Sequence, residues 1–456
     1  MKKLIIVAAS VILAGAVLAD SVGNGWEYHG YGRSGITQNT DFANPDMEGQ
    51  DGSFSNAQGV QTGRLGNTNT TYIEVELVKD FQAQNGVWSK WHIMGAARTN
   101  NLSSWSPSTT YTENSNAPTE NDIFLSQAYA EMGGFGWNPN VTIWAGMRYY
   151  DRNNIWATDY YVTDYSGTGF GVQGLLNGNL NLAYVGTSNG DQSYYAGTNI
   201  DNQLGSSLAG TTSNIIADYQ LNQWGFQGNV KYNNWAQQVQ IGYGDNGTIA
   251  SASAAIWGGQ VGVTYNQPTY YGLTNGWTQT ILQYGQGLAT EWALGSSQAR
   301  IDDQTTALSN GCNSASPTDR TYQATTTGVS SFGNWQIQTV AGLLRDTPQY
   351  WQPTTSMNFV VTPMYNFTQN FALMFDMGYA YNWGANVNEG SGYLSTPFNG
   401  GIAQFTIAPT FTLSSDFFAR PQIRPFVTYL IGNQNQIMLN GANHAFLFGA
   451  QAEVWF

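Results

Sequence analysis

Runs of alternating polar and apolar residues recur along nearly the whole chain, and they constrain its fold most. Residues 72–77 read YIEVEL, so the aliphatic side chains share one face of a strand and the tyrosine and glutamates share the other. Each run has about ten residues, the length that a tilted strand needs to cross a bilayer. Further runs lie at 141–150, 225–233, 235–245, 256–266, 334–344, 358–367, 370–382, 401–412, 421–431 and 446–456.

The composition favours a membrane barrel over other folds with alternating strands. Only 10% of the 456 residues are charged, whereas 14% are aromatic and 53 are glycine. Disordered chains lack aromatic residues, and a net charge of −14 gives no basic surface for nucleic acid. At roughly 24 residues for each strand and its connection, we expect an all-β, transmembrane, antiparallel β-barrel of about 18 strands.

The two ends of the chain suggest export to an outer membrane. Residues 1–19 combine two lysines, an apolar run and a small-residue cleavage pattern, so we expect a cleaved secretory signal peptide and a mature start at Asp20. The last alternating run closes on Phe456, which is typical of outer-membrane barrels. We expect one barrel domain over 20–456, with long outward loops at 37–62, 99–122, 297–325 and 383–400.

The residues that enzymes and metal sites require are scarce. Cys312 is the only cysteine, and the three histidines are His29, His92 and His444. The sequence has no Cys/His cluster for a metal. We therefore expect neither an enzyme nor a bound cofactor.

Several motifs, in order along the chain, resemble the maltoporins, the sugar-specific porins of Gram-negative outer membranes. The stretch 26–36 reads WEYHGYGRSGI, and 64–67 reads RLGN. The resemblance is strongest at 142–152, TIWAGMRYYDR, and it returns at RPQIR (420–424) and FGAQAEVWF (448–456). Together these motifs span the first strand to the last.

The resemblance implies a homotrimer of eighteen-stranded barrels in outer-membrane lipid, each with a constriction loop folded inward at roughly 151–172. It implies facilitated diffusion of sugars, maltose and maltodextrins or related oligosaccharides, along a lane of aromatic rings beside a polar track. A periplasmic sugar-binding protein as a further partner stays open. By motif, the lane residues are Tyr31, Tyr72, Trp105 and Trp455, the constriction residue is Tyr161, and the polar track is Arg33, Arg64, Glu74, Arg152 and Asp159.

The chain also departs from the family pattern, which leaves its sugar preference open. Leu125 stands where the family has a track arginine, and Asn154 stands where it has an acid. Two lane aromatics are missing, in 280–282 and 356–358, and either Trp277 or Trp351 is a candidate to compensate. The alternative function is a general diffusion porin, but 15 lysines and arginines leave few for the basic rows of such pores.

Overall fold

The computed structural model describes the chain in stretches separated by gaps. The described residues are 25–39, 62–66, 70–83, 85–100, 121–188, 211–233, 240–243, 250–300, 315–349, 353–387, 396–432 and 444–456. Within these stretches, no helix has the length and apolar character that crossing a membrane requires.

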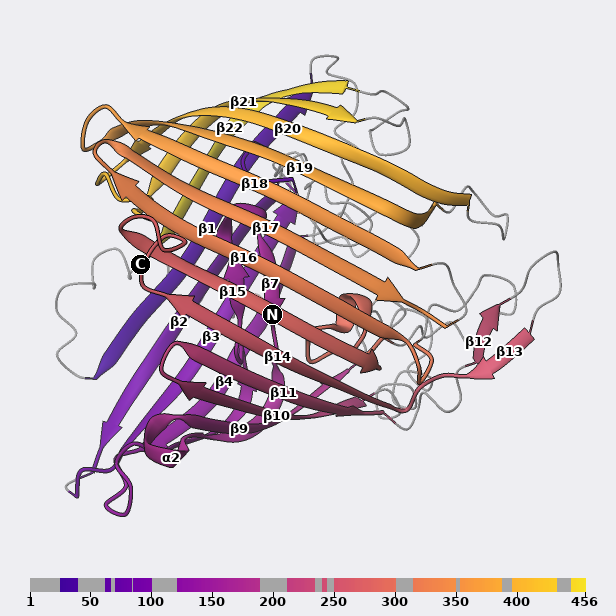
Figure 1. Cartoon of the computed structure of the whole chain (residues 1–456). Helices are drawn as coiled ribbons and strands as arrows, with labels where there is room; N and C mark the ends of the chain where they lie inside the picture. The colour runs from indigo at the N-terminus through magenta and orange to yellow at the C-terminus, as the bar shows by residue number, and fades with distance from the viewer. Residues whose placement is uncertain are drawn as a thin grey trace.

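Eighteen of the described strands form one antiparallel sheet that closes into a barrel (Figure 1). Each strand pairs with the next wall strand along the chain, and the first strand pairs with the last. The expected strand number and the all-β class are therefore confirmed. The wall strands are β1 (Trp26–Asn39), β2 (Thr70–Gln82), β3 (Trp88–Asn100), β4 (Asn121–Gly133), β5 (Thr142–Arg148), β8 (Gly167–Gly174), β9 (Leu180–Ser188), β10 (Thr211–Leu221), β11 (Trp224–Tyr232), β14 (Trp257–Gln267), β15 (Gly276–Gly287), β16 (Arg320–Phe332), β17 (Trp335–Thr347), β18 (Thr354–Asn366), β19 (Phe371–Val387), β20 (Thr396–Thr412), β21 (Gln422–Gly432) and β22 (His444–Trp455).

Alternation along each wall strand sorts the side chains between the two faces of the barrel. On β21, Ile423 and Val427 are exposed on the outer face, whereas Arg424 and Leu430 are fully buried inside. On β2, Ile73 is exposed outside, in line with the apolar row predicted there. The apolar rows thus face outward and the polar rows face the interior, as in membrane barrels.

One predicted wall strand is not part of the wall. Within the run at 235–245, the described strand β12 (Gln240–Tyr243) pairs only with β13 (Ala250–Ser253), in a separate two-stranded sheet. The expectation of a wall strand at 235–245 is therefore wrong. Alternation indicates a strand with two different faces, and a small hairpin outside the barrel satisfies that pattern as well as a wall strand does.

The short connections between wall strands gather at one end of the barrel, which we call the turn end. Residues 222–223 join β10 to β11, residues 333–334 join β16 to β17, and the short helix α2 (Leu175–Gly178) follows β8. Figure 1 shows these connections on the left, with the C-terminus. In outer-membrane barrels the short turns face the periplasm, so the turn end is the periplasmic end.

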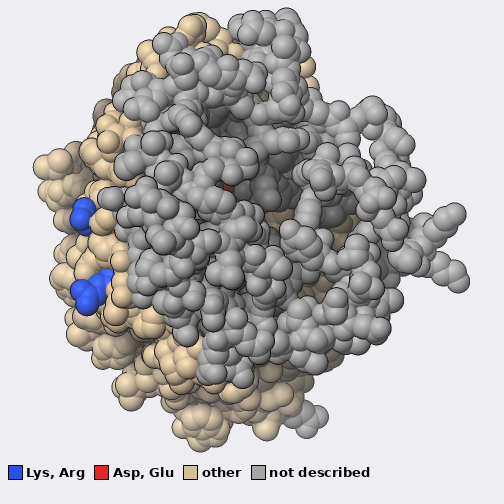
Figure 2. Space-filling view, turned by 90° about the vertical axis from the view of Figure 1, so that its right-hand side faces the viewer, with Lys and Arg blue, Asp and Glu red and all other residues tan. Residues whose placement is uncertain are grey.

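Charged side chains are sparse on the outer wall. Figure 2 looks at the opposite end, and the described wall around it is almost wholly tan, with lysine and arginine visible only near one edge. A wall of this kind suits contact with lipid, because a charged side chain on the lipid face costs free energy.

Three chain segments leave the wall and fill part of the interior. The first, residues 62–66, places Leu65 against Met364, Met374 and Phe417. The second, residues 149–166, comprises β6 (Asn153–Ile155), the 3-10 helix η1 (Trp156–Thr158) and β7 (Tyr160–Thr163). Its apolar residues pack on the inner faces of β15, β17 and β18: Ile155, Ala157 and Val162 against Ile281, Val340 and Val360.

The inward segment 149–166 is shorter than the predicted loop at 151–172. Residues 167–172 belong to wall strand β8, which pairs with β5 and β9. A third segment, with the 3-10 helix η4 (Glu291–Ala293), also leaves the wall after β15, and Lys231 Nζ donates to the Ala293 carbonyl over 2.7 Å.

Candidate functional site

Three aromatic rings form a row across three neighbouring strands on the inner wall. The closing register of the barrel sets Tyr31 on β1 opposite Trp455 on β22. Tyr72 on β2 lies opposite Arg33, two residues further from the turn end than Tyr31, and its ring centroid is 6.2 Å from that of Tyr31. All three rings are half-buried, so each keeps a face toward the interior. Three of the four predicted lane residues are thus brought together.

The carboxylate of Glu453 is the centre of an arginine cluster beside this row. It is only 1% exposed, and it pairs with Arg64 over 2.9 Å, Arg420 over 2.8 Å and Arg424 over 2.8 Å. The Tyr31 hydroxyl donates to the same carboxylate over 3.0 Å. Arg64, a predicted track residue, reaches this cluster because segment 62–66 folds inward.

Asp159 joins the inward segment to the aromatic row. Its carboxylate pairs with the guanidinium of Arg33 on β1 and accepts a hydrogen bond of 3.4 Å from the Asn154 amide. Burial acts to raise the pKa of Asp159, but Arg64 and Arg33 outweigh burial and hold this pKa below its ordinary value. Asp159 is therefore ionised at neutral pH, and it holds the segment close to the row.

Arg152 lies between two tyrosines at a second polar cluster. Its guanidinium is 3.9 Å from the ring centroid of Tyr149 and 4.3 Å from that of Tyr161, and it pairs with Asp164 over 3.2 Å. The Tyr149 hydroxyl donates to Glu74 over 3.0 Å. The Tyr72 hydroxyl donates to the same carboxylate, so this cluster connects the inward segment to the aromatic row.

Trp156 is a central residue that the sequence analysis did not single out. Its ring lies against three guanidinium groups, 5.0 Å from Arg64, 5.3 Å from Arg420 and 5.7 Å from Arg424. Phe417 packs edge-on to it at 5.5 Å. Its only signal in the sequence was its position, four residues after Arg152 at the end of the strongest motif. Alternation could not orient it, because it lies in a 3-10 helix.

Arg420 and Arg424 were noted in a motif but given no role. Arg420 stacks over the Trp455 ring at 3.9 Å, and Arg424 is 1% exposed beneath the same row. The face shared by Glu453 and Trp455 was visible from alternation. The convergence of β21 and segment 62–66 on that face depends on strand register and on an irregular loop, which the sequence does not reveal.

The structure shows where several residues that depart from the family pattern lie. Leu125 is 52% exposed on the outer wall next to a register shift in β4, so it does not line the interior. Trp277 is 40% exposed at the turn end of β15, on the same face of the strand as Ile281, so its role as a compensating ring stays a prediction. Ile281 and Ser356 face the interior where two lane aromatics are missing. Trp105 and Trp351 lie outside the described residues.

The described interior combines ring faces with many hydrogen-bonding groups. Such a surface can stack a flat, weakly polar solute face while donors and acceptors meet its polar rim. In the described part of the chain, no group of three or more His, Cys, Asp or Glu residues is arranged to hold a metal ion.

Comparison of the sequence with known proteins agrees with the family motifs. A sequence profile described as LamB porin matches residues 26–456. The chain is similar to proteins named maltoporin from Vibrio cholerae (26% identity, covering all of both chains) and Photobacterium profundum (24% identity, covering 99% of this chain and 98% of that one). A solved structure of a BenF-like porin from Pseudomonas fluorescens is similar at 10% identity and a TM-score of 0.48, covering 94% of this chain and 98% of that one. With the profile matching first wall strand to last, the chain belongs to the LamB porin family.

Proposed function

We propose that this outer-membrane porin conducts neutral oligosaccharides, maltose and maltodextrins or related glucans, over the row of Tyr72, Tyr31 and Trp455. The observation that carries the proposal is the continuity of this row. Its three rings lie on adjacent strands, and Tyr31 and Tyr72 are 6.2 Å apart. The name maltoporin of the full-length relatives supports the choice of sugar.

The physical reason is that a sugar ring has an apolar face and a rim of hydroxyls. A hydroxyl that leaves water without a new partner costs free energy, so a pore for sugars needs polar groups beside its aromatic surface. In this proposal the track consists of Arg33, Arg64, Glu74, Arg152 and Asp159, and Tyr161 narrows the passage. Glu453 holds Arg64 in place beside Tyr31. Several weak contacts in sequence let the sugar enter and also leave.

Planar-bilayer recording tests the proposal directly. Linear glucans added to the open channel should reduce the ion current reversibly and with saturation. Polyethylene glycol of equal mass should not, because it lacks the hydroxyl rim that the track recognises. A channel that passes both solutes without a saturable block would be a general diffusion porin instead.

We also propose that three copies assemble into a homotrimer. The outer face near the barrel closure carries small residues, Ser34, Ala450 and Ala452, beside Ile36 and Ile423. Small side chains leave a shallow groove in which another copy can approach the wall closely. On gels, unboiled samples should migrate as a trimer and boiled samples as a monomer.

Cleavage after Ala19 and transfer of sugar to a periplasmic binding protein remain proposals as well. N-terminal sequencing of the purified protein should begin at Asp20. Co-purification with a periplasmic sugar-binding protein, dependent on added sugar, would support the transfer step.

A further inference from the structure

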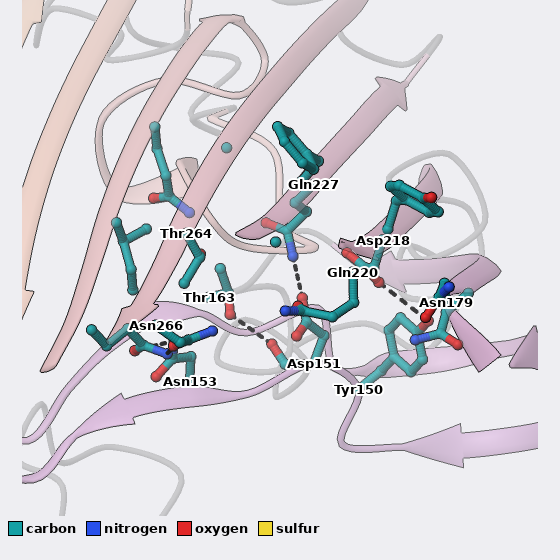
Figure 3. Close-up of a pocket in the computed structure, with 18 of the residues that line it drawn as sticks. Tyr150, Asp151, Asn153, Thr163, Asn179, Asp218, Gln220, Gln227, Thr264 and Asn266 are labelled. Atoms are coloured by element: carbon teal, nitrogen blue, oxygen red, sulfur yellow. Dashed lines mark hydrogen bonds between the residues drawn. The ribbon is translucent and has the colours of Figure 1, made fainter. Parts of the chain in front are cut away.

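A second compartment lies between the inward segment and the wall on the side of β8 to β11, β14 and β15. It has a volume of about 340 Å³, within the range of about 300–1,000 Å³ that is usual for ligand pockets. Asp151, Asn153 and Thr163 line it from the inward segment, and Asp218 and Gln227 line it from the wall (Figure 3). Gly178 and Asn179, in the turn between β8 and β9, also line it, so it lies toward the periplasmic turn end.

Carboxamide side chains dominate the lining of this cavity. Asn153 donates to Gln279 over 2.9 Å, and Gln279 in turn donates to Asn266 over 3.0 Å. A carboxamide carries two donor hydrogens and an acceptor oxygen. These side chains can therefore both donate hydrogen bonds to hydroxyl groups and accept hydrogen bonds from them. No lysine or arginine is among the residues that line the cavity.

One buried acceptor atom in the cavity has no hydrogen-bond partner among the described residues. Gln283 is only 5% exposed, and its side-chain oxygen accepts no hydrogen bond from any part of the chain that the structure describes. Gln227 donates to the Asp151 carboxylate, and the Tyr150 hydroxyl is 3.5 Å from Asp218 (Figure 3). A buried acceptor without a partner costs free energy, so a ligand that donates to it gains that amount on binding.

We propose that this cavity is a second saccharide site, for one or two neutral sugar rings on the periplasmic side of the inward segment. The proposal rests on the proposed sugar channel, because the solute reaches the cavity through the same pore. An anion would find no cationic partner in the lining. A metal ion would need acceptors alone, whereas most of the lining groups are donors as well. Neutral hydroxyls match both properties.

Two substitutions change the cavity without touching the aromatic row. A Cβ atom added at Gly262 would lie 3.5 Å from its nearest neighbour, Gln283 Cγ, so Gly262→Val fits and fills cavity volume. Gln279→Leu keeps the size of the side chain and breaks the carboxamide chain. Gln338→Leu is the matched control, because Gln338 faces the interior from β17 but does not line the cavity.

The test is current block by a linear maltooligosaccharide added to one side of the membrane at a time. With sugar on the turn side, Gly262→Val and Gln279→Leu should each weaken block about five-fold, which corresponds to roughly 1 kcal/mol of binding free energy. The first variant loses it because the cavity is partly filled, and the second because hydrogen bonds to the sugar are lost. With sugar on the loop side the change should be smaller, because the sugar meets the aromatic row first. Gln338→Leu should match the wild type from both sides.

The outcomes separate this inference from the proposed function. If the wild type shows no saturable block by sugar, the proposed function fails. If the wild type is blocked and both cavity variants behave like it from either side, only the second site is overturned. Saturable block of the wild type by calcium ions from the turn side, lost in Gly262→Val, would show that the cavity takes a cation and would also overturn it. Trimer migration on unboiled gels checks that each variant has folded.

Discussion

The guanidinium of Arg152 lies 4.3 Å from the ring centroid of Tyr161. This contact orients the tyrosine that the family resemblance assigns to the constriction. Tyr149 covers the opposite side of the same guanidinium at 3.9 Å, and its hydroxyl reaches Glu74 beside Tyr72. The position of Tyr161 is therefore set by a chain of polar contacts that ends at the aromatic row.

Tyr161→Ala should raise the open-channel conductance and weaken sugar block. The loss of one ring contact is worth about 1 kcal/mol, or roughly a five-fold change in the block constant. Tyr161→Phe keeps the ring over Arg152 and should leave both quantities close to those of the wild type. Single-channel recording with and without maltooligosaccharide measures both. Unchanged conductance and block in Tyr161→Ala would show that another residue forms the constriction.

Glu453→Gln should destabilise the barrel and make the pore favour anions. Three guanidinium groups share this buried carboxylate, and breaking such a pairing costs about 3 kcal/mol or more. The positive charge left behind attracts anions in a narrow pore. Thermal unfolding and the reversal potential in a salt gradient measure the two effects.

Glu27→Gln is the control for that experiment. It also removes one negative charge from β1, but Glu27 is more exposed and pairs with Lys90 over 2.7 Å near the turn end. It should change the unfolding temperature and the selectivity only slightly. Equal effects of the two variants would mean that total charge matters rather than the arginine cluster.

Gly378→Ala on β19 should displace segment 62–66 from the interior. A Cβ atom at this position would lie 1.3 Å from the Thr62 carbonyl oxygen, so the two cannot coexist. We expect a loss of about 3 kcal/mol, the upper end for overpacking, and a wider pore as Arg64 moves away from Glu453. Gly228→Ala on β11 meets no atom within 4 Å and should be neutral. Thermal unfolding and conductance distinguish the two variants.

Alternation predicted the face of three of the proposed lane residues but not the neighbours that they acquire. Alternation alone puts Tyr31, Tyr72 and Trp455 inside, because every second side chain of a strand shares a face. Their closeness depends on the register between β22, β1 and β2, which the family motifs suggested and alternation could not. Trp156 escaped prediction because a 3-10 helix has no period of two.

Two further features of the structure could not be predicted from strand alternation either. A register shift near Leu125 leaves this residue on the outer wall, and a pattern read without its partner strand cannot reveal a bulge. The carboxamide cavity joins residues from the inward segment with residues from six wall strands or their turns. The polar residues among them look like ordinary polar positions in the sequence, so only the folded chain shows that they converge.

Asp151 should make both stability and sugar block depend on pH near neutrality. Its carboxyl faces the cavity, but burial and the nearby carboxylates of Asp218 and Asp164 raise its pKa from an ordinary 3.8 to about 7. The folded state therefore holds a proton that the unfolded chain has already lost over this interval. The resulting stability is complete below about pH 4 and is lost as the pH rises through about 7.

Asp151→Asn resembles the protonated form and should remove this part of the pH dependence. The asparagine oxygen can still accept from Gln227, so the fold is kept. Unfolding temperatures of the wild type should fall between pH 5 and 8, and those of the variant should fall less. Turn-side sugar block should follow the same trend, because ionising Asp151 beside Asp218 strains the cavity. Parallel pH profiles for the two proteins would assign the titration to another group.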